Sequence, residues 1–350
     1  MSVVEQHPHQ DRGVTPDAFA ELTDRYRPEL LAYCYRMLGS LHDSEDVVQD
    51  TYLRAWRYFD RFEGRSSVRL WLYRIATTTC LNALRSRKRR PLPSGLSAPS
   101  ETGATALPAP ESETPWLQPA PDSILYASAA DPGVVVPLRD SVRLAFVAAL
   151  QHLSARQRAV LVLRDVLGWK AKEVAQILET STTAVNSALQ RARTQLSAAG
   201  PTQDRLTEPA EPELRALVTR YVTAFEHADI AGLADLLRAD VELEMPPIAV
   251  WFTGRDAVCE FLGRVVLRTP GQWRAIPARA NGDPAVVLYE RTPDGAYRAQ
   301  SLDILSLIGG RIARIVAFLD HRLIEAFGFP SEIAASDFQG DDFPAPMVST

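Results

Sequence analysis

The segment from Thr182 to Leu196 combines an apolar helical stripe with a polar and basic face. Apolar residues recur at helical spacing at Val185, Ala188, Leu189, Ala192 and Leu196. The opposite face carries side chains that hydrogen-bond well to nucleic acid: Thr182, Thr183, Asn186, Ser187, Gln190, Arg191 and Arg193. Asparagine and glutamine amides pair with adenine edges, arginine pairs with guanine, and threonine or arginine binds phosphate. These residue types at this spacing predict a helix that reads duplex DNA.

A shorter helix and a tight turn precede this segment. Ser154, followed three residues later by Gln157, is a capping box that starts a helix, and Gly168 ends that helix. Residues 169–178 are expected to form the next helix and residues 179–181 the turn. A short helix, a tight turn and a polar-basic helix together predict a helix-turn-helix. An ordinary helical hairpin is the alternative that the residues alone leave open.

Aromatic and basic side chains are interleaved between Phe62 and Arg90. Trp71 and Tyr73 offer flat surfaces for unstacked bases, and Trp71 is expected to be exposed because Arg69 and Arg74 lie close to it. Other members of this group supply hydrogen bonds or neutralise phosphates: Arg65, Ser66, Arg74, Arg85, Arg87, Lys88 and Arg89. The combination suits melted, single-stranded DNA, although any one aromatic ring is more typical of a core.

Three helices are expected to position these groups. Residues 15–17 (Thr-Pro-Asp) start the first, which is apolar at helical spacing up to Met37 and ends at Gly39. Asp43 is expected to cap the second helix, which has apolar residues at Val47, Val48, Leu53 and Trp56. Its acidic face carries Glu45, Asp46, Gln49 and Asp50. That face fits a basic protein partner, and a solvated surface is the alternative. The third helix follows residues 65–67.

Charge is distributed unevenly along the 350 residues. The whole chain has 38 basic and 43 acidic side chains, a net charge of −5. Residues 54–90 hold 11 basic and 2 acidic side chains, and residues 139–199 hold 9 and 4. Residues 91–138 contain 5 acidic side chains and 10 prolines without one basic residue, and residues 201–350 contain 22 acidic and 14 basic side chains. This pattern predicts a nucleic-acid binder with an acidic module attached; random variation of surface charge is the alternative.

Composition excludes several classes of protein. The length suggests two or three domains, and a hydrophobic fraction of 46% excludes a wholly disordered or fibrous chain. The sequence has neither an apolar run long enough to span a membrane nor a signal-peptide pattern, so we expect a cytoplasmic protein. Cys34, Cys80 and Cys259 are too few and too far apart for a disulfide framework or a cysteine zinc site. We find no catalytic, metal or cofactor motif, and expect no cofactor.

The proline-rich linker is expected to pack no core of its own. Trp116 and Leu117 within it are exceptions, because a disordered spacer does not need large apolar residues. Docking of these two residues on a neighbouring domain is favoured over their being stray apolar residues.

The last third of the chain predicts an α+β domain. A helical stretch runs from Pro212 to Leu237, residues 241–247 read as a strand, and residues 254–266 read as a helix. Strand-like runs then occur at 273–279, 285–291, 297–307 and 311–319, joined by turns at 293–295 and 309–310. Helices followed by a curved antiparallel sheet predict a cone-shaped domain.

Three motifs carry a resemblance to a known family. "DSEDVVQDTYLRAW" and "FEGRSSVRLWLYRIATTTCLNALRSRKRR" resemble region 2 of sigma-70 family factors, and "AVNSALQRAR" resembles region 4. The chain is most similar to the extracytoplasmic-function type, which keeps only these two regions. "PWLQP" in the linker and the C-terminal extension resemble the actinobacterial sigma G type, and the extension resembles the SnoaL-like or nuclear transport factor 2-like fold. The resemblance covers residues 15–330.

The resemblance implies roles for particular residues. Asp46, Gln49 and Asp50 match positions that bind the β′ clamp helices of core RNA polymerase. The group from Arg65 to Arg89 matches the reader of the −10 promoter element, with Asn82 near the bases, and residues 182–193 match the reader of the −35 element. Many relatives carry arginine where this chain has Ala188, so the contact of that arginine is not carried over. The further partner implied is the β flap of the polymerase.

The expected architecture is therefore multidomain, with two all-α domains and an α+β cone. The predicted boundaries are a disordered N-terminus at 1–14, region 2 at 15–91, the acidic linker at 92–137, region 4 at 138–199, a linker at 200–211, the cone at 212–330 and a disordered tail at 331–350. The predicted function is that of a sigma factor, not an enzyme, with a cone that regulates transcription initiation in cis.

Two alternatives stay open at this point. One is a DNA-binding regulator that does not engage polymerase, and the other is an enzyme whose active part is the cone. Candidate side chains for a ligand or a reaction in the cone are Glu244, Trp251, Asp303 and His321. Their spacing defines no site, so a small ligand is left open.

Overall fold

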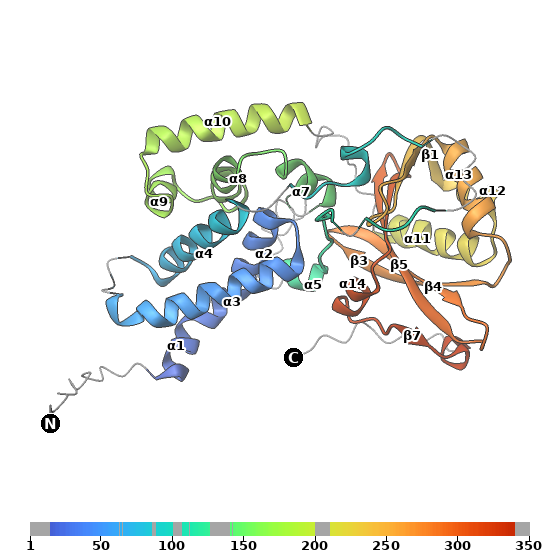
Figure 1. Cartoon of the computed structure of the whole chain (residues 1–350), viewed down its shortest axis with the longest axis horizontal. Helices are drawn as coiled ribbons and strands as arrows, with labels where there is room; N and C mark the ends of the chain where they lie inside the picture. Colours follow the sequence, from blue (N-terminus) through green and yellow to red (C-terminus); the bar gives the residue numbers. More distant parts are fainter. Residues whose placement is uncertain are drawn as a thin grey trace, which may run out of the picture.

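The computed structural model describes residues 15–62, 64, 66–85, 89–100, 107–111, 113–126, 141, 143–199 and 211–339. Arg65, Arg87 and Lys88 lie outside the described residues, as do residues 1–14 and 340–350, where disorder was expected. Figure 1 shows a helical half on one side and a half built on a curved sheet on the other.

The N-terminal bundle consists of α1 (Pro16–Thr23), α2 (Arg27–Leu38), α3 (Leu41–Tyr58) and α4 (Val68–Arg85). The single helix expected up to Met37 is broken by a 3-10 turn at residues 24–26, and the second residue of α2 is Pro28, which has no amide hydrogen to continue α1. Ser40, rather than Asp43, caps α3, because the Ser40 hydroxyl accepts a hydrogen bond from the Asp43 amide at 3.3 Å. Asp43 therefore lies inside the first turn of α3.

Gly39 ends α2 in the left-handed conformation, at φ +67°. A Cβ at this position would lie 2.7 Å from Cδ1 of Leu117, so the conformation and the close approach of the linker both require glycine.

The second helical unit consists of α7 (Leu144–Leu150), α8 (Ala155–Leu161), α9 (Ala171–Ile177) and α10 (Thr182–Ala199). The capping box at Ser154 and Gln157 is confirmed, since each side chain hydrogen-bonds to the backbone of the other. A π-helical turn at 162–166 extends α8 before Gly168 reverses the chain at φ +68°.

The C-terminal domain begins with α11 (Glu211–Glu226) and α12 (Ile230–Leu236). The expected continuous helix to Leu237 breaks at residues 227–229, where Asp229 caps α12, and Leu237 already starts a strand. The remaining elements are β1 (Leu237–Glu244), β2 (Trp251–Thr253), α13 (Arg255–Phe261), β3 (Trp273–Ala280), β4 (Asp283–Arg291), β5 (Tyr297–Ile308), β6 (Arg311–Phe318), α14 (His321–Ala326) and β7 (Glu332–Ile333). β7 lies in the segment where a disordered tail was expected.

The strands form one mixed sheet in the order β2-β1-β6-β5-β4-β3, with β7 paired to β5. All pairings are antiparallel except that of β1 with β6, which is parallel. This pair departs from the wholly antiparallel sheet that the hairpin pattern predicted.

Both faces of the sheet are buried, each in a different core. Alternate residues of a strand point to opposite sides of the sheet, so one strand contributes to both cores. Val286 and Leu288 of β4 pack with α11, α12 and α13 in one core. Ala285, Val287 and Tyr289 of the same strand belong to a second core, which also contains residues of α14, the linker, α2 and α7. The helical half and the linker thus cover the sheet face that the domain's own N-terminal helices leave open.

The linker takes part in this second core. Its contribution consists of Leu92, Leu117, Ala120 and Leu125. Leu125 is the last residue of the short helix α5 (Asp122–Leu125). Docking of Leu117 is confirmed, because it is fully buried in this second core, whereas Trp116 is 8% exposed and its indole nitrogen donates to the Glu111 carbonyl within the linker. Because the apolar partners come from other domains, the linker contributes to a shared core without packing one of its own.

Candidate nucleic-acid interface

The acidic face of α3 is built as expected. Val47, Val48 and Thr51 are buried against the bundle, which turns Asp46, Gln49 and Asp50 to the surface. Leu53 and Trp56, two of the apolar residues noted in this helix, are 48% and 41% exposed. Leu53 lies one turn beyond Gln49 and Asp50, so it extends the same face with an apolar group.

A row of exposed side chains follows one side of α4. The row consists of Trp71, Arg74, Thr78, Asn82 and Arg85. Successive members are three or four residues apart, which places them on the same side of a helix. Of these residues, Trp71 is half-buried and the others are exposed. Ser66 is also half-buried, at the start of the helix, and Arg89 is exposed beyond its end. Thr78 was not among the predicted residues, although the helical period would have found it.

The two aromatic residues predicted to stack on bases differ in position. Trp71 lies against Phe62 and Phe59, with ring centroids 4.9 Å and 6.0 Å apart, and keeps part of its surface free. Tyr73 is fully buried between Tyr33 and Trp169. The prediction of Tyr73 as a base platform is therefore wrong, because its position points into the core two residues away from Trp71.

The predicted reading face of α10 is exposed throughout. Val185, Leu189 and Ala192 are buried, and this orientation leaves the predicted residues on the surface: Thr182, Thr183, Asn186, Ser187, Gln190, Arg191 and Arg193. Arg193 forms a bidentate ion pair with Asp165, at 2.8 Å and 2.7 Å. Arg193 is thus held against the π-helical turn at 162–166, which follows α8. The residues nearer the N-terminus of α10 extend into solvent.

The two helical units contact each other next to the predicted DNA-binding residues of α4 and α10. Trp169, directly before α9, packs on Tyr73 of α4 at 4.9 Å between ring centroids, and the Arg69 guanidinium lies 4.7 Å from its ring centre. Arg74, one of the predicted DNA contacts, forms an ion pair with Glu179 in the turn before α10. Both units share one apolar core.

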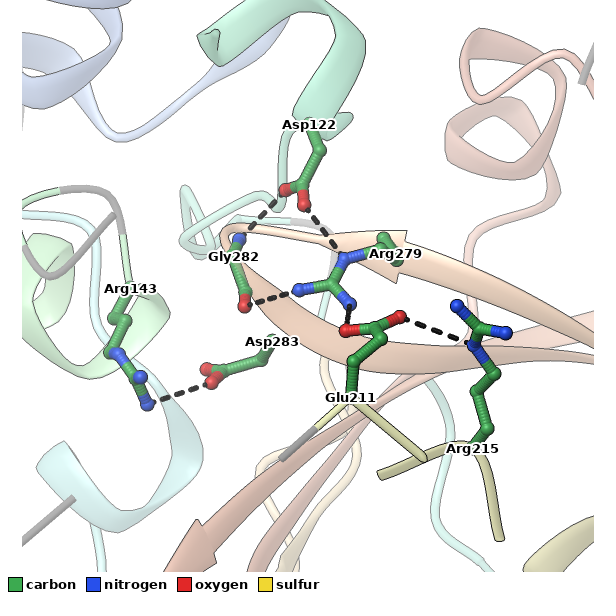
Figure 2. A network of polar contacts seen from close by, with 7 residues as sticks. All are labelled: Asp122, Arg143, Glu211, Arg215, Arg279, Gly282 and Asp283. Carbon is green, nitrogen blue, oxygen red and sulfur yellow. Dashed lines mark hydrogen bonds and ion pairs between the residues drawn. The ribbon is translucent and has the colours of Figure 1, made fainter. Parts of the chain in front are cut away.

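The turn between β3 and β4 joins three parts of the chain (Figure 2). Asp122 of the linker accepts hydrogen bonds from the Gly282 amide at 2.7 Å and from Arg279 at 3.3 Å. Arg143, which precedes α7, forms an ion pair of 3.1 Å with Asp283, and both side chains are less than 8% exposed. Glu211 of α11 lies on the other side of Arg279, at 3.8 Å.

Asn281 at the tip of this turn reaches the N-terminal bundle. Its backbone is left-handed at φ +56°, and the residue is fully buried. The side-chain oxygen accepts from the Ala120 amide at 2.9 Å, and the side-chain nitrogen donates to the Tyr35 hydroxyl at 2.8 Å. Tyr35 in turn donates to the Gln118 carbonyl at 2.8 Å. One residue of the cone therefore links α2 and the linker.

The four candidates in the cone do not come together. Asp303 accepts hydrogen bonds from Tyr221 at 3.1 Å and Ser301 at 2.7 Å, and burial raises its pKa to about 6. Glu244 and Trp251 are cross-strand neighbours that bind the linker, through the Ser94 amide at 2.9 Å and the Ser97 carbonyl at 3.0 Å. His321 is exposed at the start of α14.

Within the described ranges, no cluster of three or more metal-binding side chains occurs. Among the same residues, no helix has the length and apolar character needed to cross a bilayer.

Comparison with known proteins agrees with this division of the chain. Family models match at three places: sigma-70 region 2 at residues 22–90, sigma-70 region 4 at 143–196 and the SnoaL-like domain at 218–315. A helical bundle and a helix-turn-helix of these families, each with an exposed polar-basic face, define a sigma factor reduced to regions 2 and 4.

Individual relatives indicate which type of sigma factor the chain resembles. The chain is 50% identical over 317 residues to the extracytoplasmic-function RNA polymerase sigma factor SigG of Mycobacterium tuberculosis, covering 90% of this chain and 85% of that one. It is 29% identical over 290 residues to SigJ of the same organism, covering 80% and 84%. The crystal structure of SigJ shares the fold, with a TM-score of 0.54 at 22% identity over 91% of this chain and all of that one. The chain belongs to the extracytoplasmic-function sigma factors.

Membership settles the general function. The protein binds core RNA polymerase and recognises promoter DNA to initiate transcription, and it is not an enzyme. Its C-terminal domain has the α+β SnoaL-like fold, as in SigJ.

Proposed function

We propose that this arrangement is a closed, resting form of the sigma factor, in which the C-terminal domain holds the two promoter readers together. The observation that carries the proposal is the contact between them: Arg74 in the −10 reader pairs with Glu179 beside the −35 reader. The names −10 and −35 place the two promoter elements roughly 25 base pairs apart. This separation corresponds to ~85 Å of duplex at ~3.4 Å per base pair. Readers in direct contact do not span that distance, so region 4 must separate from region 2 before both elements are bound.

The C-terminal domain supports the closed form through the β3–β4 turn. Asn281 binds α2 and the linker, Asp283 binds Arg143 at the entry to region 4, and Asp122 fastens the linker to the same turn. The sheet face behind the turn buries apolar residues of all three segments. Region 4 is therefore tethered next to region 2 as long as the cone is docked.

The polar faces of α3, α4 and α10 suggest which residues contact the polymerase and which contact the promoter. Asp46, Gln49 and Asp50, with Leu53, bind the β′ clamp helices, and region 4 binds the β flap. The −10 contacts are Arg65, Ser66, Trp71, Arg74, Asn82, Arg85, Arg87, Lys88 and Arg89, and the −35 contacts are the seven exposed residues of α10. The protein acts in the cytoplasm. A small ligand of the cone would open the closed form if it bound the undocked cone more tightly than the docked one.

The closed form is tested by transcription and by distance. Asn281→Gly keeps the left-handed backbone but removes the amide that links Ala120 and Tyr35. With core polymerase, we expect this variant and a truncation after residue 200 to give more run-off transcript than the full chain. Fluorescence energy transfer between dyes on α3 and α10 should fall in the Asn281→Gly variant.

Asp294→Ala is the matched control, because Asp294 lies in the exposed turn between β4 and β5. Its transcription and energy transfer should equal those of the unchanged protein. Unchanged output and unchanged promoter binding in both the Asn281→Gly variant and the truncated chain would refute regulation in cis.

The polymerase interface is tested separately. Asp46→Lys reverses one charge on the α3 face without touching its buried side, and should abolish capture of the protein by immobilised core polymerase. Glu21→Lys, an equal charge change at an exposed position of α1, should leave capture intact. Equal capture of both variants would contradict the assignment of the α3 face.

A further inference from the structure

A cavity of about 180 Å³ lies between region 2 and region 4. Region 2 contributes Asp43, Arg89 and Arg90 to its lining, and region 4 contributes Ala155 and Arg158. Among the described residues, three of the four charged side chains that line the cavity are therefore arginines, and they come from both sides of the contact that defines the closed form.

The single carboxylate of the lining pairs with only one of these arginines. Arg90 binds Asp43 at 2.5 Å and the Trp116 carbonyl at 2.8 Å. Arg158 donates to uncharged acceptors, the Met37 carbonyl, the Gln151 side-chain oxygen and the Leu153 carbonyl. Its Nε is buried and has no hydrogen-bond partner among the described residues. Arg158 is 4% exposed, and within the described part of the chain this buried cation has no carboxylate partner.

Arg89 adds a second positive charge. Its guanidinium contacts Nε2 of His152 at 2.5 Å, a contact that requires the imidazole to be neutral and to accept. Burial, followed by the charge of Arg89, lowers the pKa of His152, and burial alone lowers the pKa of Arg89. Burial likewise lowers the pKa of Arg158 to about 10. The lining carries a formal charge of +2 in a partly desolvated space, which is costly without a counter-charge.

We propose that this cavity, named here the junction site, binds a phosphate-type dianion that bridges region 2 and region 4 and stabilises the closed form. The inference rests on the closed arrangement proposed above. Two negative charges balance the lining, and arginine guanidiniums match the oxygens of a phosphate in fork geometry. The space of about 180 Å³ is large enough for one phosphate group.

Calorimetric titration of the full chain with sodium phosphate at pH 7.5 and constant ionic strength tests the junction site. We expect one phosphate to bind, and Arg89→Gln to weaken binding at least tenfold. Ala155→Asp places a carboxylate at the cavity wall, in the first turn of α8 where an acid is favourable. It should abolish binding without unfolding the protein. Arg291→Gln, an exposed arginine of the C-terminal domain, is the matched control and should bind phosphate like the unchanged chain.

A parallel titration with a nucleoside monophosphate distinguishes the source of the phosphate group. Binding of both ligands assigns the site to a phosphate group on a larger molecule that projects from the cavity, and binding of phosphate alone assigns it to the free ion. Absence of binding at millimolar phosphate, or equal binding by Arg89→Gln, overturns the proposal.

Energy transfer between dyes on α3 and α10 distinguishes failure of the junction site from failure of the proposed closed form. Phosphate should raise the transfer in the Asn281→Gly variant. A closed unchanged chain that does not bind phosphate refutes only the junction site, whereas an unchanged chain that shows no closed form refutes the proposed function whatever phosphate does.

Discussion

Asp303 shows how the interior of the cone responds to pH at the level of one residue. Its ordinary pKa of 3.8 rises to about 6 in the fold because the carboxyl is buried, despite hydrogen bonds from Ser301 and Tyr221. The raised value means that the folded state binds the proton more tightly than the unfolded state does. The stabilisation is complete below about pH 4 and is lost as the pH rises through 6.

We expect the C-terminal domain to lose about 3 kcal/mol of stability between pH 4 and pH 7.5 from this group, at ~1.4 kcal/mol per pKa unit. Urea unfolding at both pH values measures the loss. Asp303→Asn, which cannot ionise, should flatten that part of the profile. A variant with an unaltered pH profile would show that another group is responsible.

Arg143 and Asp283 form a buried ion pair whose two halves come from different domains. Asp283→Ala leaves Arg143 buried without this carboxylate, so the variant should be less stable by about 3–5 kcal/mol. Arg143→Met together with Asp283→Ala removes both charges and should cost less than the sum of the single changes. A double-mutant cycle by urea unfolding measures the coupling, and strictly additive losses would argue against the pair.

Some residue positions follow from the sequence and others do not. The exposed residues of α10 follow because Val185, Leu189 and Ala192 define its buried side by period alone. Tyr73 and Trp71 are equally aromatic and close in sequence, so composition does not show which of them is buried. Asn281 with Gly282 forms an Asn-Gly pair, which signals a hairpin turn, but nothing near it in sequence indicates its contacts with Tyr35 and Ala120.

At the scale of elements, the helix-turn-helix is the part in which sequence and structure agree best. Its capping box and helical period are local signals, and local signals depend little on the rest of the fold. The division of the first predicted helix at residues 24–26 depends on Pro28, which was available in the sequence. The short strand β2 and the parallel pairing of β1 with β6 depend on long-range contacts that no local pattern encodes.

The reading face of α10 leads to a prediction for promoter binding by the unfastened Asn281→Gly variant. An added Asn186→Ala or Gln190→Ala change should remove about 1–3 kcal/mol of discrimination against a mutated −35 element. If Arg191 contacts a phosphate rather than a base, an added Arg191→Gln change should weaken all sequences alike and reduce the salt slope by about one. Competition binding with native and mutated duplexes separates the two effects. A uniform loss from Asn186→Ala would make that residue a backbone contact.

On the scale of the whole molecule, the net charge of −5 is a sum of unlike parts. Two basic readers oppose an acidic linker and an acidic C-terminal third, and charge attraction alone would suggest that salt releases the cone. The structure indicates otherwise, because the contacts at Asn281 and Asp283 are buried and an apolar face surrounds them. Buried contacts are screened much less than exposed ones.

Salt should therefore separate closure from DNA binding. Between 50 and 500 mM sodium chloride, we expect energy transfer between α3 and α10 in the unchanged chain to stay nearly constant. Promoter binding by the Asn281→Gly variant should fall more than tenfold over the same range, since counterions are released from phosphates. Loss of energy transfer at high salt would mean that surface charge, rather than the buried turn, holds the cone.

The order of the segments along the chain has a consequence during synthesis. Regions 2 and 4 emerge from the ribosome before residues 211–350, which contain every strand of the described sheet. Translation of those 140 residues takes about 7–28 s at ~5–20 residues per second. During this interval both readers exist without the turn that fastens them. Under the proposed regulation in cis, each new molecule would stay open until its C-terminal domain folds, so a rapid rise in synthesis would itself produce a brief supply of open sigma factor.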